Sequence, residues 1–241
     1  MLLPDGGRTL AELLEGDALA QALADALPVY AALQRAVAPH AGRLLELGLA
    51  DMRAAAIPQR FEQALEVVRG YVEAHGDGED RAALQRAAAL GPQVAGWARE
   101  LADAPGDVTI DHNDLHAHNV LLRDGEATFF DWGDSVVAHP FSSMSVALTF
   151  IQQRALGGCE LDDPRLLAVR DAYLAPFADL APHAELVRTL EIACRLAKVG
   201  RALTWEWVIG SLQPADVIDE WRRAPLACLR SLADDSYLGG P

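Results

Sequence analysis

The chain has 241 residues and a formal net charge of −15, and 51% of its residues are hydrophobic. This length fits one domain or two small ones, and the hydrophobic content is high enough for a folded core. Nucleic acid is excluded as an expected partner, because a phosphate backbone binds basic surfaces. An acidic surface would attract a cationic small molecule, although acidity more often serves solubility.

Membrane insertion and secretion are also not expected. No apolar run reaches the roughly 18 residues of a membrane span, and residues 1–10 lack the basic start and long apolar core of a signal peptide. Cys159, Cys194 and Cys228 are odd in number and far apart, which argues against a disulfide framework. We therefore expect a cytoplasmic protein without a membrane partner.

The first hundred residues have a helical pattern. Thr9 and Glu12 form a capping box at the start of a first helix. Apolar residues at helical spacing then predict helices over residues 17–37, 58–75 and 80–103. Pro105-Gly106 ends this helical half.

A short β-rich segment follows. Residues 107–110 (DVTI) predict a strand, and residues 119–132 predict two strands around the turn Asp124-Gly125. Helices return afterwards, one starting at Asp163-Pro164 and others near Pro182 and Pro214. The sequence therefore predicts a mainly helical α+β fold with one small β-hairpin.

Residues 111–119 (DHNDLHAHN) form a polar cluster that holds three His, two Asp and two Asn. If Asp124-Gly125 is the two-residue turn, Asn119 faces Phe130 across the hairpin and Asp131 lies beside Asn119. A carboxylate and an amide oxygen suit Mg²⁺, which usually keeps some waters and binds phosphate oxygens. A separate carboxylate, Asp114, could orient and deprotonate a hydroxyl. This layout is typical of phosphoryl transfer.

The motifs HNDLHAHN (112–119) and FFDWGD (129–134) resemble those of the aminoglycoside phosphotransferase and choline kinase-like family, which has a protein-kinase-like fold. The first resembles its H-x-D-x-x-x-x-N catalytic loop, here within 111–119, and the second its version of the D-F-G segment. The resemblance implies that Asp114 is the catalytic residue, that Asn119 and Asp131 bind Mg²⁺, and that ATP is the co-substrate. It also implies that His112 and His116 brace the loop.

Three positions depart from the family pattern. Asn113 and His118 stand where relatives often have Gly, and His139 stands before Pro140 where relatives often have Asp. The departure at His139 puts in doubt the hydrogen bonding that usually follows the metal-binding segment.

The small ATP-binding lobe of this family has no counterpart in the sequence. Lys198 is the only lysine and lies far downstream, and Gly6-Gly7 does not fit a phosphate-binding loop. We therefore interpret residues 1–7 as a hinge strand, with Leu2 and Leu3 at the edge of an adenine site. Residues 8–241 would form the helical C-terminal lobe. Without the small lobe this chain is expected to be inactive, and its open face near Phe130 would favour self-association.

Candidates for substrate binding are Asp134, Trp205 and Glu206, because an aromatic and acidic pocket could hold a cationic group. Tryptophans at helical spacing could equally pack in the core. The expected function is ATP- and Mg²⁺-dependent phosphorylation of a hydroxyl on a small, cationic molecule.

Three alternatives remain open. The chain could be a non-catalytic, small-molecule-binding relative of these kinases, or the polar loop could be only a capped turn. In an extended strand His112, Asp114, His116 and His118 would share one face, which would suit a zinc-dependent hydrolase.

Overall fold

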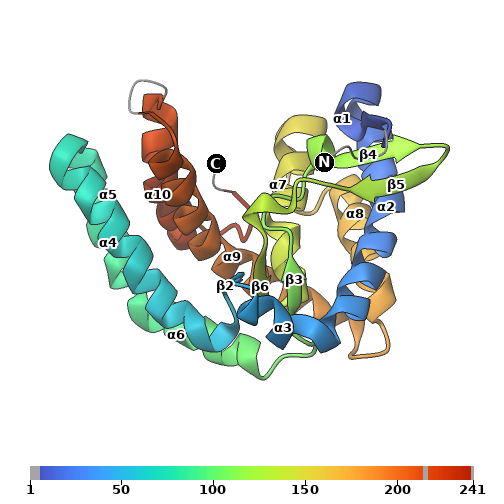
Figure 1. Ribbon diagram of the computed structural model, residues 1–241, viewed down its shortest axis with the longest axis horizontal. Helices are drawn as coiled ribbons and strands as arrows, with labels where there is room; N and C mark the ends of the chain where they lie inside the picture. Colours follow the sequence, from blue (N-terminus) through green and yellow to red (C-terminus); the bar gives the residue numbers. More distant parts are fainter. Residues whose placement is uncertain (1–5, 214–216, 240–241) are drawn as a thin grey trace.

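Helices make up most of the structure, which is a computed structural model that describes residues 6–213 and 217–239 (Figure 1). The α-helices are α1 (Leu10–Leu13), α2 (Gly16–Val37), α3 (Ala41–Glu46), α4 (Ile57–His75), α5 (Gly78–Ala89), α6 (Gly91–Ala102), α7 (Met144–Phe150), α8 (Pro164–Leu174), α9 (His183–Ser211) and α10 (Asp219–Arg230). Single turns of 3-10 helix are η1 (Ala38–His40), η2 (Ala54–Ala56), η3 (Ala117–Asn119), η4 (Trp132–Asp134), η5 (Pro140–Ser143), η7 (Ala175–Phe177) and η8 (Ser231–Ala233). A π-helix, η6 (Ile151–Ala155), continues α7.

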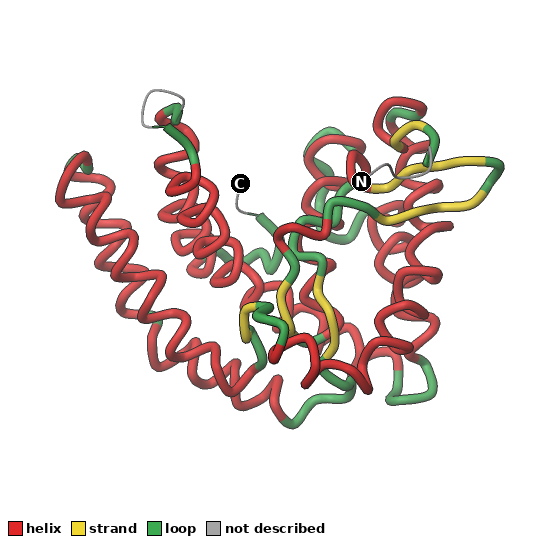
Figure 2. The backbone as a smooth tube through the Cα atoms, viewed as in Figure 1, coloured by secondary structure: helices red, strands yellow, loops and turns green. Residues whose placement is uncertain are grey.

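Two small sheets lie among the helices (Figure 2). The strands are β1 (Arg8–Thr9), β2 (Ala50–Asp51), β3 (Thr109–Asp111), β4 (Val120–Arg123), β5 (Glu126–Phe129) and β6 (Val136–Ala138). One sheet has the antiparallel order β1-β4-β5, and the other has the order β2-β6-β3 with β2 and β6 parallel. The prediction of a mainly helical α+β fold is confirmed.

The long helix α9 organises the packing. It contacts α4, α6, α7 and α10, while α2 packs along α8 on the side of the molecule that carries the β4–β5 hairpin (Figure 1). The buried side of α9 is apolar, with Leu190, Ala193 and Val199 fully buried. Because α9 spans the molecule, its C-terminal half reaches the loop between β3 and β4.

Most predicted helices are present. The capping box at Thr9 is formed: the Glu12 N–H donates to Thr9 Oγ1 at 3.2 Å, and Thr9 N–H donates to Glu12 Oε2 at 2.9 Å. Asp163 caps α8, and α9 follows Pro182. A strand precedes α1 at Arg8–Thr9, and Leu2, Leu3 and Pro214 lie outside the described residues.

The prediction of a single helix over residues 80–103 was wrong. The chain instead forms α5 and α6, which separate at Leu90. Pro92 explains the break, because in a continuous helix it has no N–H to donate four residues back and its ring would clash with the carbonyl there. Pro92 stands in the first turn of α6, where an N–H has no intrahelical partner.

The hairpin register was predicted correctly. Arg123 pairs with Glu126 and Leu121 with Thr128, and Phe130 N–H donates to the Asn119 carbonyl at 3.2 Å. The predicted strand at 107–110 is shifted to Thr109–Asp111. No helix in the described ranges 6–213 and 217–239 is long and apolar enough to cross a membrane.

His139 replaces the expected aspartate as a helix cap. Its Nδ1 accepts a hydrogen bond from Phe141 N–H at 3.2 Å at the start of η5, and its Nε2 donates to the Pro105 carbonyl at 3.1 Å. Only a neutral imidazole makes both bonds at once, because a protonated Nδ1 could not accept from Phe141 N–H. Burial lowers the pKa of His139 from its usual 6.5 to about 4, which the hydrogen bond to Pro105 only partly opposes.

We expect His139 to make the free energy of unfolding fall as the pH falls from 6.5 toward 4. In this window the unfolded chain binds a proton that the folded chain does not, so protonation favours unfolding. The effect should reach on the order of 3 kcal/mol at the acidic end. Urea denaturation at several pH values should show a smaller acid loss in His139→Asn, which keeps an acceptor but does not titrate. The exposed His40→Asn is the control, and equal pH dependence in all three proteins would contradict the assignment.

Candidate active site

The polar loop after β3 owes its shape to Asn113. This residue has a positive φ of 60°, a conformation that Gly and Asn adopt most easily. Its side-chain amide donates to Thr204 Oγ1 in α9 at 2.8 Å and to the Asp134 carbonyl at 3.2 Å. An asparagine can therefore stand at this position of the family motif and also fasten the loop to α9.

A buried polar network supports the loop from behind. Asp111 Oδ1 accepts hydrogen bonds from Ser143 Oγ at 2.6 Å and from Asn113 N–H at 2.8 Å. Tyr30 Oη lies 2.7 Å from Ser143 Oγ, and Gln34 donates to the Ile110 carbonyl at 3.0 Å. Burial raises the pKa of Asp111, against the effect of these hydrogen bonds. The network joins α2 and η5 to the base of the loop.

Asp114 lies at the front of the loop with about a quarter of its side chain exposed. Asn119 Nδ2 donates to the Asp114 carbonyl at 2.9 Å and to its Oδ2 at 3.2 Å. His116 Nε2 is 3.3 Å from Oδ2, and Arg201 Nη1 is 3.2 Å from Oδ1. Burial acts to raise the pKa of Asp114, but the His116 hydrogen bond and the Arg201 charge outweigh it and lower the pKa. Asp114 is therefore ionised and still reachable from solvent.

The two predicted bracing histidines make different contacts. His112 is fully buried, and its Nε2 donates to the Phe130 carbonyl at 2.8 Å, next to Asp131. The His112 ring also lies 4.7 Å from the Trp132 ring. His116 stacks on Phe150 and contacts Asp114. His112 thus links the loop to the 129–134 segment, whereas His116 touches the carboxylate of Asp114.

Asp131 stands two residues after the end of β5 and lies beside Asn119, because Phe130 N–H is hydrogen-bonded to the Asn119 carbonyl. It is exposed and has a positive φ of 61°. Since Asn119 uses its amide nitrogen to hold Asp114, its Oδ1 is the atom left for a metal. One amide and one carboxylate oxygen suit Mg²⁺, which takes its other ligands from water and phosphate. The residues present therefore fit this metal.

The arrangement needed for a zinc hydrolase is not formed. Residues 112–116 turn instead of forming a strand, and residues 117–119 form η3. His112 is buried and His118 is exposed, so the histidines do not share one face. In the described part of the chain, no three His, Cys, Asp or Glu side chains are grouped as metal ligands.

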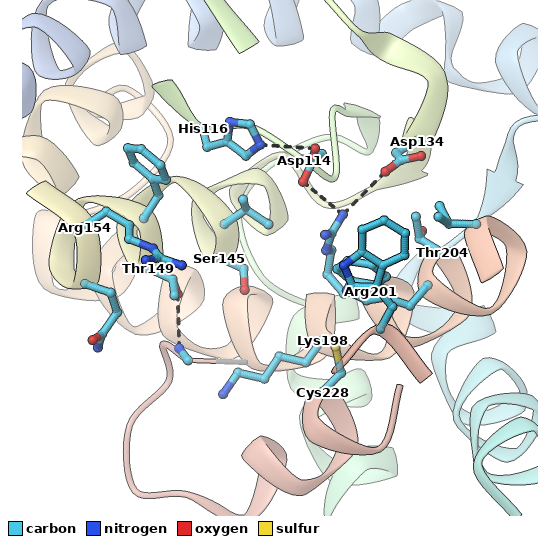
Figure 3. A pocket seen from close by; sticks show the side chains of 17 residues that line it. Asp114, His116, Asp134, Ser145, Thr149, Arg154, Lys198, Arg201, Thr204 and Cys228 are labelled. Atoms are coloured by element: carbon cyan, nitrogen blue, oxygen red, sulfur yellow. Dashed lines mark hydrogen bonds and ion pairs between the residues drawn. The ribbon is translucent and has the colours of Figure 1, made fainter. Parts of the chain in front are cut away.

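A cleft of about 770 Å³ opens beside Asp114 (Figure 3). Its walls come from α7 and η6 on one side and from α9 and α10 on the other. Ser145, Thr149 and Arg154 line the first wall, and Lys198 and Arg201 line the second. The cleft gives a small molecule access to the Asp114 carboxylate.

Comparison with known proteins identifies the family. The model of the phosphotransferase enzyme family (APH) matches residues 2–186, which include the polar loop, the hairpin and Asp131. The chain belongs to this phosphotransferase family. A search of curated proteins found no match. All of α9 after Leu186 and all of α10 lie outside the matched residues, so the cleft wall that these helices form lies beyond the part that identifies the family.

The predicted substrate residues of this phosphotransferase-family chain do not all gather at the cleft. Asp134 and Trp205 line it, but Glu206 is exposed and lines a second cleft of about 730 Å³, which Asp134 also borders. The Trp205 ring is 5.8 Å from the Arg201 guanidinium, so a cation of the protein itself lies over it. Burial raises the pKa of Asp134, against the effect of Arg201.

Arg201 is the functional residue that the sequence analysis missed. Its Nη1 donates to the Asn113 carbonyl at 2.9 Å and lies 3.2 Å from Asp114 Oδ1 and 3.6 Å from Asp134 Oδ2. One guanidinium, on a side chain that is 11% exposed, thus holds the loop and bridges two carboxylates. The available signal was its position one helical turn before Trp205, but only the fold brings this turn to the loop.

We expect Arg201→Gln to raise the pKa of Asp114, because the substitution removes the positive charge nearest to Oδ1. Carboxyl ¹³C NMR titration of the wild type and the variant measures this shift. Arg154→Gln removes the same charge from the cleft without touching Asp114 and is the matched control. An Asp114 pKa that Arg201→Gln leaves unchanged would contradict the role given to the ion pair.

Proposed function

We propose that this phosphotransferase-family protein transfers the γ-phosphoryl group of ATP to a hydroxyl of a small molecule, with Mg²⁺. The observation that carries the proposal is the position of Asp114. It is ionised, opens onto a cleft, and is tied through Asn119 to the Asp131 segment. The resemblance of residues 112–119 and 129–134 to motifs of aminoglycoside phosphotransferases supports phosphoryl transfer as the reaction class. It does not identify the substrate.

In the proposed reaction, the hydroxyl oxygen of the substrate attacks the γ-phosphorus and the bond to the bridging oxygen of ADP breaks. ADP leaves with the bonding electrons, and the hydroxyl proton passes to Asp114. His116 and Arg201 hold the Asp114 carboxylate in place from two sides. This positioning matters because phosphoryl transfer depends mainly on alignment and electrostatics.

Asn119 Oδ1 and the Asp131 carboxylate would hold Mg²⁺. The bound ion would neutralise charge on the phosphate oxygens. Asn119 would therefore have two tasks, since its amide nitrogen orients Asp114 while its oxygen would bind the metal. A cytoplasmic location, where ATP is plentiful, forms part of this proposal and agrees with the free cysteines among the described residues.

Release of ADP tests the proposal, and it is measured on the full-length gene product, which is this chain together with any residues that its gene encodes beyond it. With a panel of amino alcohols, hydroxy acids and aminoglycosides, we expect ADP release to require both an added alcohol and Mg²⁺. Removal of Mg²⁺ with a chelator is the control. Ligand binding without ADP release would favour the binding-protein alternative instead. ADP release that persists without any alcohol would contradict transfer to a hydroxyl.

A cationic group on the substrate remains a prediction. Asp134 and Glu206 are carboxylates that could bind it, but both line the second cleft, and Asp134 alone lines the cleft beside Asp114. The cleft that reaches Asp114 has a different charge pattern.

A further inference from the structure

The cleft beside Asp114 carries more positive than negative side chains. Arg154, Lys198 and Arg201 line it, against two carboxylates, Asp114 and Asp134. The whole chain has a net charge of −15, so this is a local reversal of sign. Both carboxylates lie within 3.6 Å of Arg201, which partly neutralises them. Arg154 and Lys198 form no ion pair with any residue in the ranges 6–213 and 217–239.

Arg154 offers an open guanidinium at the cleft. It lies in the π-helix η6, a widened turn of a kind often found at functional sites. Its side chain is exposed, and it makes no ion pair or hydrogen bond with another residue in the described ranges. In Figure 3 it lies beside Thr149, away from the group formed by Asp114, Arg201 and Asp134. A guanidinium can bind a carboxylate or a phosphate through two parallel hydrogen bonds.

Lys198 adds a positive charge in the wall of the cleft. It is almost fully buried, and its Nζ donates to the carbonyls of Ser231 at 2.9 Å and Leu238 at 3.3 Å. No carboxylate of the described residues forms an ion pair with it. Burial lowers the pKa of Lys198 to about 8, so it is mostly protonated at neutral pH. Asp234 acts on Lys198 only from beyond ion-pair distance. A buried cation without a direct ion pair is costly, and a nearby anion reduces that cost.

Hydroxyl groups complete this end of the cleft. Thr149 Oγ1 accepts a hydrogen bond from Gly239 N–H at 3.1 Å, which leaves its own proton to donate. Ser145 lies one turn earlier on the same helix and also lines the cleft. This end therefore offers cations and hydroxyl donors, and the carboxylates among the described lining residues, Asp114 and Asp134, lie in the group around Arg201 instead.

We propose that the substrate carries a carboxylate or phosphate group in addition to its reacting hydroxyl. Arg154 would bind this acidic group, and the positive charge of Lys198 in the cleft wall would add to the attraction. The hydroxyl would then face Asp114 while the acidic group occupies the α7–η6 end of the cleft. The identity of the reacting hydroxyl rests on the proposed function, but binding of the acidic group does not require ATP.

Four probes with the same three-carbon skeleton test the proposal: glycerol, glycerate, glycerol 3-phosphate and 3-amino-1,2-propanediol. Ligand-observed NMR titration of the nucleotide-free chain gives their dissociation constants. We expect glycerate or glycerol 3-phosphate to bind at least about tenfold more tightly than glycerol, as a charge-assisted pair allows. Tighter binding of glycerate would indicate a carboxylate site, and tighter binding of glycerol 3-phosphate would indicate a phosphate site. The amine should bind most weakly of the four probes.

Arg154→Gln should remove most of the preference for the acidic probes and leave glycerol binding unchanged. Arg86→Gln makes the same change of charge on the exposed face of α5, outside the cleft, and should keep the preference. The proposal is overturned if no acidic probe binds more tightly than glycerol, if the amine binds best, or if both variants behave alike. Failure of phosphoryl transfer would leave these binding results unchanged, so the two proposals fail separately.

Discussion

Asp114→Asn in the full-length gene product should lower kcat on the order of 10²-fold or more, with a modest change in the KM for ATP. The amide keeps the size and the contact with Arg201 Nη1 through its oxygen, but it cannot accept the hydroxyl proton. Steady-state kinetics with saturating MgATP measure the loss.

Asp124→Asn is the matched control for this variant. It makes the same chemical change in the exposed β4–β5 turn, where the side chain is 91% exposed. Its kcat should equal that of the wild type. Turnover by Asp114→Asn at the wild-type rate would remove Asp114 from the reaction.

Asp131→Asn should cause the second large loss, again on the order of 10²-fold in kcat, because it removes the charged ligand proposed for Mg²⁺. Mn²⁺ binding, followed by electron paramagnetic resonance in the presence of nucleotide, should weaken in the same variant. Asn119→Ala should reduce Mn²⁺ binding too and should also release the Asp114 carboxylate from its amide donor. Unchanged Mn²⁺ affinity in both variants would place the metal elsewhere, and Asp124→Asn again provides the control.

The sequence was most informative where contacts are local. The Asp124-Gly125 turn set the hairpin register, and this register placed Asp131 beside Asn119. The capping box at Thr9 and the cap at Asp163 are likewise defined within four residues. Short-range spacing determines such features, so they can be read without the fold.

Long-range contacts could not be predicted in the same way. The strands β2 and β6 have two and three residues and pair across more than eighty positions of sequence, so neither leaves a recognisable pattern. Arg201 reaches the Asn113 carbonyl across 88 positions. Its role depends on how α9 packs against the loop between β3 and β4, and no sequence motif predicts that packing.

The residues predicted to bind substrate also depend on long-range packing that the sequence pattern does not reveal. Glu206 and Trp205 are neighbours in sequence, but on a helix adjacent residues point in different directions. Trp205 therefore lines the cleft beside Asp114, and Glu206 lines the second cleft. Arg154 gave no sequence signal, because its exposure at the cleft depends on the π-helix that follows α7.

The most direct test of the central claim is ³¹P NMR of the products formed by the full-length gene product with MgATP and an accepted alcohol. We predict a phosphate monoester of that alcohol in amounts equal to ADP, and none of it with Asp114→Asn. Formation of inorganic phosphate in place of the ester, or equal ester formation by the variant, would contradict transfer to a hydroxyl at Asp114.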